Sequence, residues 1–480
     1  MAKATREKRD KQFGKWFRQM LIDAEILDYR YPIKGCGVWM PYGYKIRRLV
    51  TQLLRQLHDG TGHDEVQFPV MVTETNLRKE AEHIRDFENE VFWITHGGLK
   101  ALEIKFALRP TSETAMYPML RLWIRSHSDL PKKLYQIGSV FRCETKTTRP
   151  IIRVREVTTF KEAHTCHATF EESEAQILEA TQIYKGFFDA CGVPYVISRR
   201  PEWDKFPGAF YSLSFDVIMP DGRTLQSGTV HNLGQNFSRA FDIQYETLGG
   251  DHEYIWQTCY GISERAIGAL ISVHGDDNGI VLMPDLAPIQ IVIIPIPSKE
   301  NPQTILDTCR EVADELRSEG FRISIDRRED LTPGAKFYYW ELRGVPVRLE
   351  IGPKDVSRRQ VIIVRRDTFQ KEACKIADLP KGMRRLMNDM SDALRDKARK
   401  WMESRVHRVA TLDEAAKLLK CRAGIVELPW CGDAKCGHII EERVNAKLLG
   451  TQAGSEERTH GGCAICEKKA RGLVRAAVAY

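Results

Sequence analysis

The feature that most constrains the fold is a change of hydrophobic pattern at residues 283–288, a short segment that contains two prolines. Before it, from residue 11 to about residue 276, long helical stretches alternate with strands whose turns are antiparallel in character, such as the Pro-Asp-Gly turn at 219–223. After it, apolar strands alternate with amphipathic helices, a pattern typical of a mostly parallel sheet. These strands are expected at residues 289–296, 321–326, 347–351 and 361–364, and the helices at 303–319 and 336–343.

A highly charged stretch at residues 383–408 is expected to form a helix that leads into a third region. The chain has 480 residues, and a typical length of roughly 150 residues per domain also gives about three domains. We therefore expect an α+β domain with an antiparallel sheet flanked by helices at 1–284, an α/β domain at 285–385, and a small α+β domain at 386–480.

Composition places the chain among folded globular proteins, because 42% hydrophobic and 29% charged residues suit packed cores rather than disorder. Lysine and arginine number 72 and acidic residues 65, a net charge of +7 that permits nucleic-acid contact but equally fits an ordinary basic protein. No export signal or membrane-spanning apolar run is evident. Eight of the twelve cysteines are scattered, which favours a reducing compartment. We expect a cytoplasmic protein without membrane contact.

Two short segments carry the most specific chemistry. Residues 141–144 follow an apolar stretch and contain Arg142 and Glu144, and residues 261–265 place Arg265 in the first turn of an apolar helix. Arginines held on a strand and at a helix start can bind the α- and γ-phosphates of a nucleotide. Such an arrangement suits attack of a carboxylate on the α-phosphorus with loss of pyrophosphate. Buried structural salt bridges are the alternative for both arginines.

Other polar side chains of the first domain are ambiguous by residue type alone. Glu113 can accept a hydrogen bond from an ammonium or a secondary amine, and the Thr111 hydroxyl can orient it. A Thr-x-Glu sequence is also a common helix cap. His231 could lie beside a substrate, although a lone histidine is more often a satisfied core residue.

The two arginine-bearing segments resemble signature motifs of the class II aminoacyl-tRNA synthetases. Residues 108–114 (Leu-Arg-Pro-Thr-Ser-Glu-Thr) further resemble the amino-acid-binding loop of prolyl-tRNA synthetases, and residues 160–165 and 226–237 are also similar to that family. The resemblance extends from about residue 13 to residue 480 and is to the archaeal and eukaryotic-type group. The bacterial-type enzymes carry a large editing insertion, and the interval between the two class motifs is too short here to contain one.

The resemblance implies activation of L-proline with ATP to prolyl-adenylate and transfer of the prolyl group to tRNA(Pro), with Arg142 and Arg265 as the catalytic residues. Phe160 and Phe206 would form apolar walls, a role that only the resemblance separates from ordinary core packing. Proline would be bound by Thr111, Glu113, Arg142, Phe160, His164, Phe206 and His231. ATP, together with Mg²⁺, would be bound by Arg142, Glu144, Arg155, Gln226, Thr229, Ser263 and Arg265, with Ser263 also capping the helix.

The second domain would read the anticodon. Glu341, Arg348, Lys354 and Asp355 correspond to positions at which the family contacts anticodon guanines. Carboxylates suit guanine because they accept from its N1 and N2 hydrogens, and the aromatic residues at 336–341 suit unstacked bases. Solvated surface charge is the alternative reading of the charge runs in this domain.

Cys431, Cys436, Cys463 and Cys466 form two pairs near the C-terminus, a spacing that predicts a closed tetrahedral Zn²⁺ site with a structural role. His438 and His460 are near enough in sequence to replace a ligand, and disulfides are the alternative in an oxidising compartment. The resemblance also implies that the chain end folds back toward the first domain, so that the Tyr480 carboxylate could matter.

Class II motif 1, expected at residues 29–71 around Pro41, implies a homodimer. The same fold charging another small amino acid is one alternative. A non-catalytic paralogue that binds tRNA is another, but the presence of Arg142, Glu144, Gln226 and Arg265 argues against it.

Overall fold

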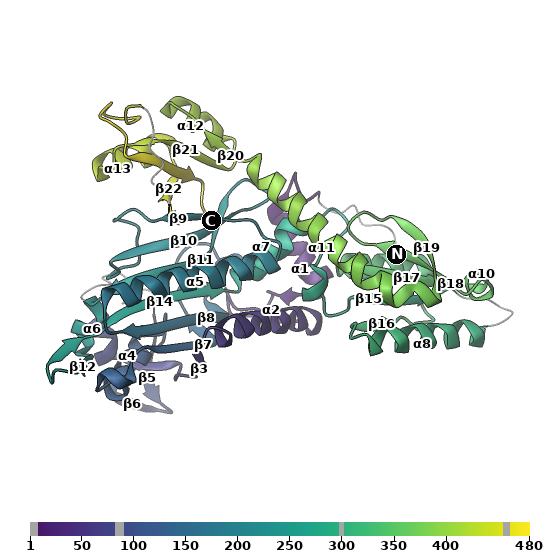
Figure 1. The fold of residues 1–480 in the computed structure, drawn as a ribbon, viewed down its shortest axis with the longest axis horizontal. Helices are drawn as coiled ribbons and strands as arrows, with labels where there is room; N and C mark the ends of the chain where they lie inside the picture. Colours follow the sequence, from purple (N-terminus) through teal and green to yellow (C-terminus); the bar gives the residue numbers. More distant parts are fainter. Residues whose placement is uncertain (1–7, 82–90, 297–301, 455–460) are drawn as a thin grey trace.

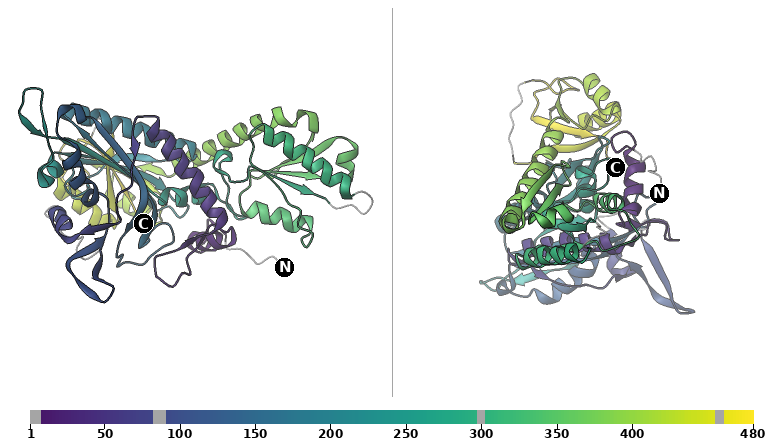
Figure 2. Two further views of the ribbon diagram at one scale, coloured as in Figure 1. Left: turned by 90° about the horizontal axis from the view of Figure 1, so that it is seen from below. Right: turned by 90° about the vertical axis from the view of Figure 1, so that its right-hand side faces the viewer.

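The computed structural model describes residues 8–81, 91–296, 302–454 and 461–480. A large sheet with its helices forms one end of the long axis, and a second, smaller domain forms the other end (Figures 1 and 2). The long helix α11 (Leu379–Glu403) runs from the second domain to a third one, which lies beside the large sheet (Figure 1). Within the described ranges, no helix is long and apolar enough to cross a membrane.

The large sheet has eleven strands in the order β20-β21-β23-β22-β9-β10-β11-β14-β8-β7-β3. Only the β20–β21 and β3–β7 pairs are parallel, so the predicted antiparallel sheet is confirmed. The predicted turn at 219–223 joins β10 to β11. The strands from the first domain are β3 (Asp64–Glu65), β7 (Lys132–Phe141), β8 (Glu156–His167), β9 (Val196–Arg199), β10 (Tyr211–Ile218), β11 (Thr224–Gly234) and β14 (Trp256–Ser263).

Helices α5 (Phe170–Ala190) and α7 (Arg265–His274) pack on this sheet, and α2 (Pro41–Asp59) packs on α5. The alternation of strand side chains decides which residues these helices bury. On β14, Tyr260 and Ile262 join the main hydrophobic core, whereas their neighbours in sequence face the opposite side. That opposite face is the one left open for a site.

The remaining elements of the first domain form its periphery, including a three-stranded sheet of order β4-β6-β5. They are α1 (Phe13–Asp23), β1 (Leu27–Asp28), β2 (Val38–Trp39), β4 (Met71–Thr73), α3 (Glu74–Ala81), β5 (Phe92–Gly97), β6 (Lys100–Leu108), α4 (Glu113–Trp123), α6 (Asn236–Phe241), β12 (Gln244–Glu246) and β13 (His252–Tyr254).

The second domain contains a five-stranded sheet of order β16-β15-β17-β18-β19. The expectation of a mostly parallel sheet is wrong in detail, because β15 is parallel to both neighbours but β17–β18 and β18–β19 are antiparallel. The β18–β19 connection is too short for a crossover and can only reverse the chain. The elements are β15 (Ile291–Pro295), α8 (Pro302–Ser318), β16 (Ile323–Ile325), α9 (Pro333–Leu342), β17 (Val347–Ile351), α10 (Pro353–Ser357), β18 (Gln360–Arg365) and β19 (Lys371–Lys375).

The third domain continues the sheet of the first, since β22 pairs with β9 through Thr451–Arg199 and Gln452–Ser198. The charged helix expected to reach residue 408 ends at Glu403, because residues 406–408 pair with β21. The expected domain boundary at 385/386 falls inside α11. The other elements are β20 (Val406–Arg408), α12 (Leu412–Lys420), β21 (Ile425–Trp430), α13 (Ala434–Val444), β22 (Lys447–Gln452) and β23 (Gly472–Ala477).

Candidate active site

A cavity of about 330 Å³ opens on the face of β14 that is turned away from α5. Its walls come from β8, β11 and β14, the segments after β7, the start of α7 and the loop before β10. The predicted site residues that line it are Thr111, Glu113, Arg142, Glu144, Phe160, Phe206, Gln226, Thr229, His231, Ser263 and Arg265. Residues from six separate segments of the sequence therefore meet in one cavity.

One end of the cavity is strongly cationic. Arg142 follows β7 and donates its Nε to the Pro110 carbonyl at 3.3 Å, while Arg265 begins α7 and donates its Nε to the Ile152 carbonyl at 2.7 Å. Burial, together with the nearby Arg142 and Arg153, lowers the pKa of Arg265 to about 10. The carbonyl bonds fix the guanidiniums without neutralising them, so this end is built to receive an anion.

Of the other residues predicted to bind the nucleotide, some line the cavity and one does not. Glu144 lies 4.0 Å from the Nε of Arg153, and both line the cavity. Arg155 does not line it; its Nη2 faces the Glu144 carbonyl oxygen at 3.4 Å. Helix α7 has Glu264 rather than Ser263 at its N-cap, although the Ser263 hydroxyl accepts a bond from the Arg265 amide at 3.3 Å.

A second part of the cavity, its acidic end, holds two buried carboxylates, Glu113 and Glu162. The Thr111 hydroxyl bridges them, with a short hydrogen bond to Glu113 and one of 3.0 Å to Glu162. Burial raises the pKa of both groups, and the charge of Glu113 raises that of Glu162 further. Helix α4 is capped by Ser112 without a side-chain bond, so Thr111 acts in the cavity rather than as the cap.

Aromatic and imidazole rings close the sides of this acidic end. The rings of Phe206 and His231 lie 4.8 Å apart, and the guanidinium carbon of Arg142 lies 5.8 Å from the ring centre of Phe160. His164 lies behind the wall, with its Nδ1 3.1 Å from the Tyr117 hydroxyl. Burial lowers the pKa of His164 to about 4 and that of His231 to about 3, so both rings are neutral at pH 7.

Several site residues were not predicted. Glu162 and Cys259 line the acidic end, where the Cys259 thiol donates to Glu113 Oε1 at 3.3 Å. Arg153 lines the cationic end. Alternation along β8 could have revealed Glu162, because it lies two residues after Phe160 and therefore on the same face. The sequence contains no comparable signal for Cys259. Its spacing to Arg265 becomes informative only once residues 256–263 are known to form strand β14.

In the second domain, Glu341 and Arg348 form an ion pair of 2.6 Å, and the Arg348 guanidinium lies 4.0 Å from the ring centre of Phe337. Lys354 and Asp355 lie on α10, where Asp355 accepts a bond from the Gly352 amide and Lys354 is exposed. At its predicted anticodon positions the domain therefore presents one ion pair, in which Arg348 is buried and Glu341 is partly exposed, and one short helix that bears the exposed Lys354.

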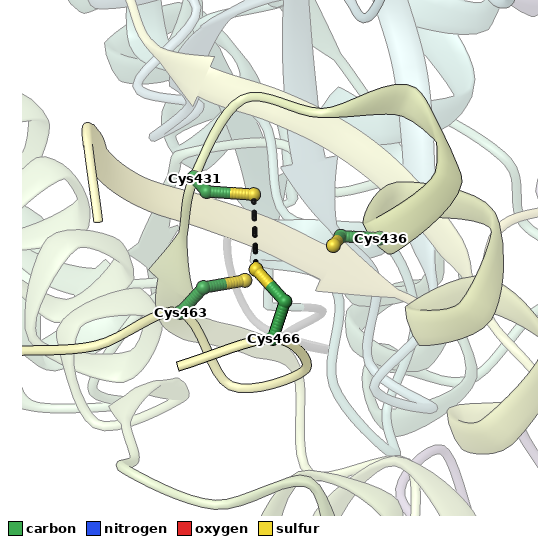
Figure 3. A group of neighbouring side chains, drawn as sticks. All are labelled: Cys431, Cys436, Cys463 and Cys466. Carbon is green, nitrogen blue, oxygen red and sulfur yellow. Dashed lines mark hydrogen bonds between the residues drawn. The ribbon is translucent and has the colours of Figure 1, made fainter. Parts of the chain in front are cut away.

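The four predicted C-terminal cysteines converge in the third domain. All four sulfurs lie within 4.8 Å of one another and the thiols are unbridged. Figure 3 shows the side chains pointing toward one another, with Cys431 and Cys466 sulfurs 3.7 Å apart. Four thiols at such distances fit a tetrahedral soft-metal site and exclude an existing disulfide. His438 instead packs against Trp203, and His460 lies outside the described residues.

The chain end folds back onto the first domain, as the resemblance implied. The Tyr480 amide donates to the Thr224 carbonyl at 3.0 Å, and its hydroxyl donates to Asp221 at 3.0 Å. Its ring lies between two guanidiniums, 3.8 Å from Arg223 and 5.0 Å from Arg149. Asp221 and Arg223 belong to the β10–β11 turn, so Tyr480 packs against the turn that joins two central strands of the sheet that bears the cavity.

Similarity to known families agrees with this geometry. Residues 92–274 match the model described as tRNA synthetase class II core domain (G, H, P, S and T), residues 290–386 match the anticodon binding domain, and residues 412–480 match prolyl-tRNA synthetase, C-terminal. The fold, the paired arginines and these matches define a class II aminoacyl-tRNA synthetase.

Relatives of known name refine that class. The proline–tRNA ligase of Metallosphaera sedula is 52% identical to this chain, over 100% of both chains. That of Methanopyrus kandleri is 51% identical, over 98% of this chain and 96% of the other. The solved structure of Giardia lamblia prolyl-tRNA synthetase in complex with prolyl-adenylate has a TM-score of 0.96 at 36% identity, over 99% of this chain and 100% of that one. This chain therefore belongs to the prolyl-tRNA synthetase family, and the predicted resemblance is confirmed.

Proposed function

We propose that this protein activates L-proline with ATP to form prolyl-adenylate and pyrophosphate, and then transfers the prolyl group to tRNA(Pro). The observation that supports this most directly is that buried carboxylates and arginines line the same cavity. Proline carries the matching groups, since its secondary ammonium belongs to a small apolar ring and its carboxylate is attached to the ring carbon next to that nitrogen. Membership in the prolyl-tRNA synthetase family supports the same reaction.

Each end of the cavity then has a defined part in binding proline. Glu113, oriented by Thr111, accepts the ammonium hydrogens of proline, and the apolar ring lies against Phe160, Phe206 and His231. A cation at this position relieves the repulsion between the buried carboxylates of Glu113 and Glu162, which explains why two such groups are tolerated together. The His164 ring supports this wall from behind.

The cationic end receives the reacting groups. Arg142 contacts both the proline carboxylate and the α-phosphate, and it stabilises the charge that develops at the pentavalent phosphorus. Arg265 holds the γ-phosphate, assisted by its place at the start of a helix. Glu144 accepts from the adenine amine, while Gln226, Thr229 and Ser263 bind phosphate and ribose oxygens. Mg²⁺ arrives with ATP and neutralises phosphate charge. Arg155 acts only indirectly, through the Glu144 backbone.

The second domain would bind the anticodon of tRNA(Pro). Glu341 offers a carboxylate for the N1 and N2 hydrogens of guanine, and Arg348 holds that carboxylate in place. Lys354 is exposed and suits a phosphate, while Asp355 lies beside it on α10. The nearby ring of Phe337 offers a surface for a base.

Zn²⁺ is the metal that best fits the four-cysteine cluster, since four thiolates in a reducing compartment bind it in a closed tetrahedral site. Cys431, Cys436, Cys463 and Cys466 would hold it, and its role would be structural.

A homodimer is supported by exposed apolar side chains within the predicted motif 1 stretch. These are Tyr31, Ile33, Val38, Tyr44, Val70 and Met71. Sedimentation that found only monomer would contradict the dimer. The cytoplasmic location remains a prediction from cysteine usage.

The first experiment is ATP–pyrophosphate exchange with proline, alanine, cysteine, threonine and serine. Exchange that depends on proline and is far faster than with the others supports the proposal. Amino acids that differ by one or two methylenes are discriminated by only about 1–3 kcal/mol of binding free energy. Weak exchange with alanine or cysteine is therefore compatible with a proline-specific enzyme. Exchange with another amino acid would overturn the pocket assignment. No exchange with any of them would favour a tRNA-binding paralogue.

Two variants sharpen this test. Glu113→Gln keeps the shape of the pocket but removes its charge, so the KM for proline should rise, while Glu171→Gln at the exposed start of α5 should change nothing. Arg142→Ala should abolish exchange and leave tRNA binding intact. Unchanged exchange in Arg142→Ala would contradict its assignment.

A further inference from the structure

The loop at residues 200–210 forms one wall of the cavity and is not part of the sheet. Lys205, Phe206 and Pro207 line the cavity from this loop. The Phe206 amide donates to the Ser212 hydroxyl at 3.0 Å, and that hydroxyl lies 2.7 Å from Nδ1 of His231. The loop therefore carries Phe206, and through the Ser212 hydroxyl it is linked to His231, the other ring assigned to the proline pocket.

The outer side of the same loop is held by the third domain through Trp203. Its ring lies 4.4 Å from that of His438 and 6.2 Å from that of Trp430. Its Nε1 donates to Glu441 Oε2 at 3.2 Å. The indole also lies against Gly437, where an added Cβ would overlap its Cη2 atom. Trp203 is partly buried and thus packs against the core of a domain that lies far from it in sequence.

The surface that receives Trp203 is built directly around the cysteine cluster. Trp430 immediately precedes Cys431, and Gly437 immediately follows Cys436. Both Gly437 and Cys436 belong to α13, whereas Cys431 follows β21 directly, so the cluster brings the two elements together. A metal bound by the four cysteines would therefore fix the two surfaces that hold the indole.

We propose that Trp203 is a positioning residue for the amino-acid substrate, through which the four-cysteine domain sets the affinity of the pocket for proline. This inference rests on the assignment of the cavity to proline. The third domain is then not only a remote structural module, because Gly437, next to Cys436 in sequence, meets Trp203, and Trp203 lies three residues before Phe206 in the loop that lines the cavity. The nucleotide end of the cavity has no contact with Trp203 among the described residues, so ATP binding is expected to be independent of it.

The test compares Trp203→Ala and Gly437→Ala in the full-length protein. Gly437→Ala adds a methyl group that must displace the indole, whereas Gly382→Ala on α11 adds one in open space and serves as the matched control. For both test variants the KM for proline in pyrophosphate exchange should rise about tenfold, with the KM for ATP unchanged. Trp203→Phe should recover part of the affinity, because it restores a ring against Gly437.

Two readouts are independent of activity. The rise in Tm that saturating proline produces should shrink in Trp203→Ala and Gly437→Ala, while the zinc content per chain stays that of the unaltered protein. In a Trp203→Ala background, Gly437→Ala should have less than about a twofold further effect, because the two changes act on one contact.

A proline KM that stays within twofold in Trp203→Ala would overturn the proposal. So would a parallel rise in the KM for ATP, or additive effects in the double variant, because either would show a general loss of structure. Failure of the unaltered protein to exchange with proline would instead refute the assignment of the cavity to proline, so the two failures are distinguishable.

Discussion

Arg265→Gln should lower activity and at the same time raise stability, because the free protein holds three arginines close together. The depression of the Arg265 pKa to about 10 is caused first by burial and then by Arg142 and Arg153, with Glu144 as a compensating acid. Each pKa unit corresponds to about 1.4 kcal/mol, so the charged guanidinium is disfavoured by about 3 kcal/mol at neutral pH. Glutamine removes this charge and keeps a donor for the Ile152 carbonyl.

The net gain in stability should be smaller than the full electrostatic relief, because the bond from a charged donor to Ile152 is replaced by a neutral one. A gain of about 1 kcal/mol corresponds to a rise in Tm of roughly 2–4 °C for a domain of this size. Loss of one preorganised donor to the phosphates should lower kcat of pyrophosphate exchange by about 10²–10³-fold. Function and stability are therefore expected to change in opposite directions.

The assay measures exchange and thermal unfolding on the same preparations, with and without saturating ATP. Arg317→Gln, on the exposed end of α8, is the control and should change neither quantity. ATP should raise the Tm of the unaltered protein more than that of Arg265→Gln. A variant that retains exchange within threefold, or that loses several degrees of Tm without ATP, would refute the reasoning.

Three further predictions address other parts of the molecule. Burial raises the pKa of Glu264 to about 7. Because this folded pKa lies above the unfolded one, the free energy of unfolding should fall by up to about 3 kcal/mol as pH rises from 4.5 through 7. Glu264→Gln should flatten the profile of Tm against pH. Cys436→Ser should lower the zinc content measured by atomic emission and reduce Tm, and zinc that stays at full occupancy would remove Cys436 from the site. Glu341→Gln should raise the KM for tRNA about tenfold with pyrophosphate exchange unchanged, so a fall in exchange would contradict an anticodon role.

Sequence patterns correctly predicted those elements whose conformation depends mainly on residues close in sequence. The apolar run that begins at Arg265 is helix α7, and the strand expected at 347–351 is β17 with the same ends. The Pro-Asp-Gly sequence forms the turn between β10 and β11 because its glycine, Gly222, readily adopts the φ of 77° that the turn requires. These features require no knowledge of distant residues.

Features that depend on distant pairing were missed. Nothing in residues 447–452 indicates that they pair with β9, which lies about 250 residues earlier in sequence, since strand partners are chosen by packing and not by propensity. The choice of Arg153 rather than Arg155 as a cavity residue depends on the bend at residues 149–153, where Arg149 and Arg153 pair across a tight turn. Sequence spacing alone does not reveal which arginine of such a bend faces inward.

Strand β8 shows why the site sits where it does. Phe160 and Glu162 line the cavity, so alternation places Lys161 on the other side of the strand, where it is fully buried. There its Nζ lies 2.9 Å from His58 on α2 and donates to Tyr184 on α5 at 2.9 Å, and burial lowers its pKa. The hydrogen bonds and the rings of Tyr184 and Tyr260 stabilise the buried lysine. A shift of β8 by one residue would remove the lysine from these partners, so the register of the strand is fixed. One strand thereby ties the substrate pocket to α2, the helix that begins at Pro41 within the predicted dimer-forming stretch.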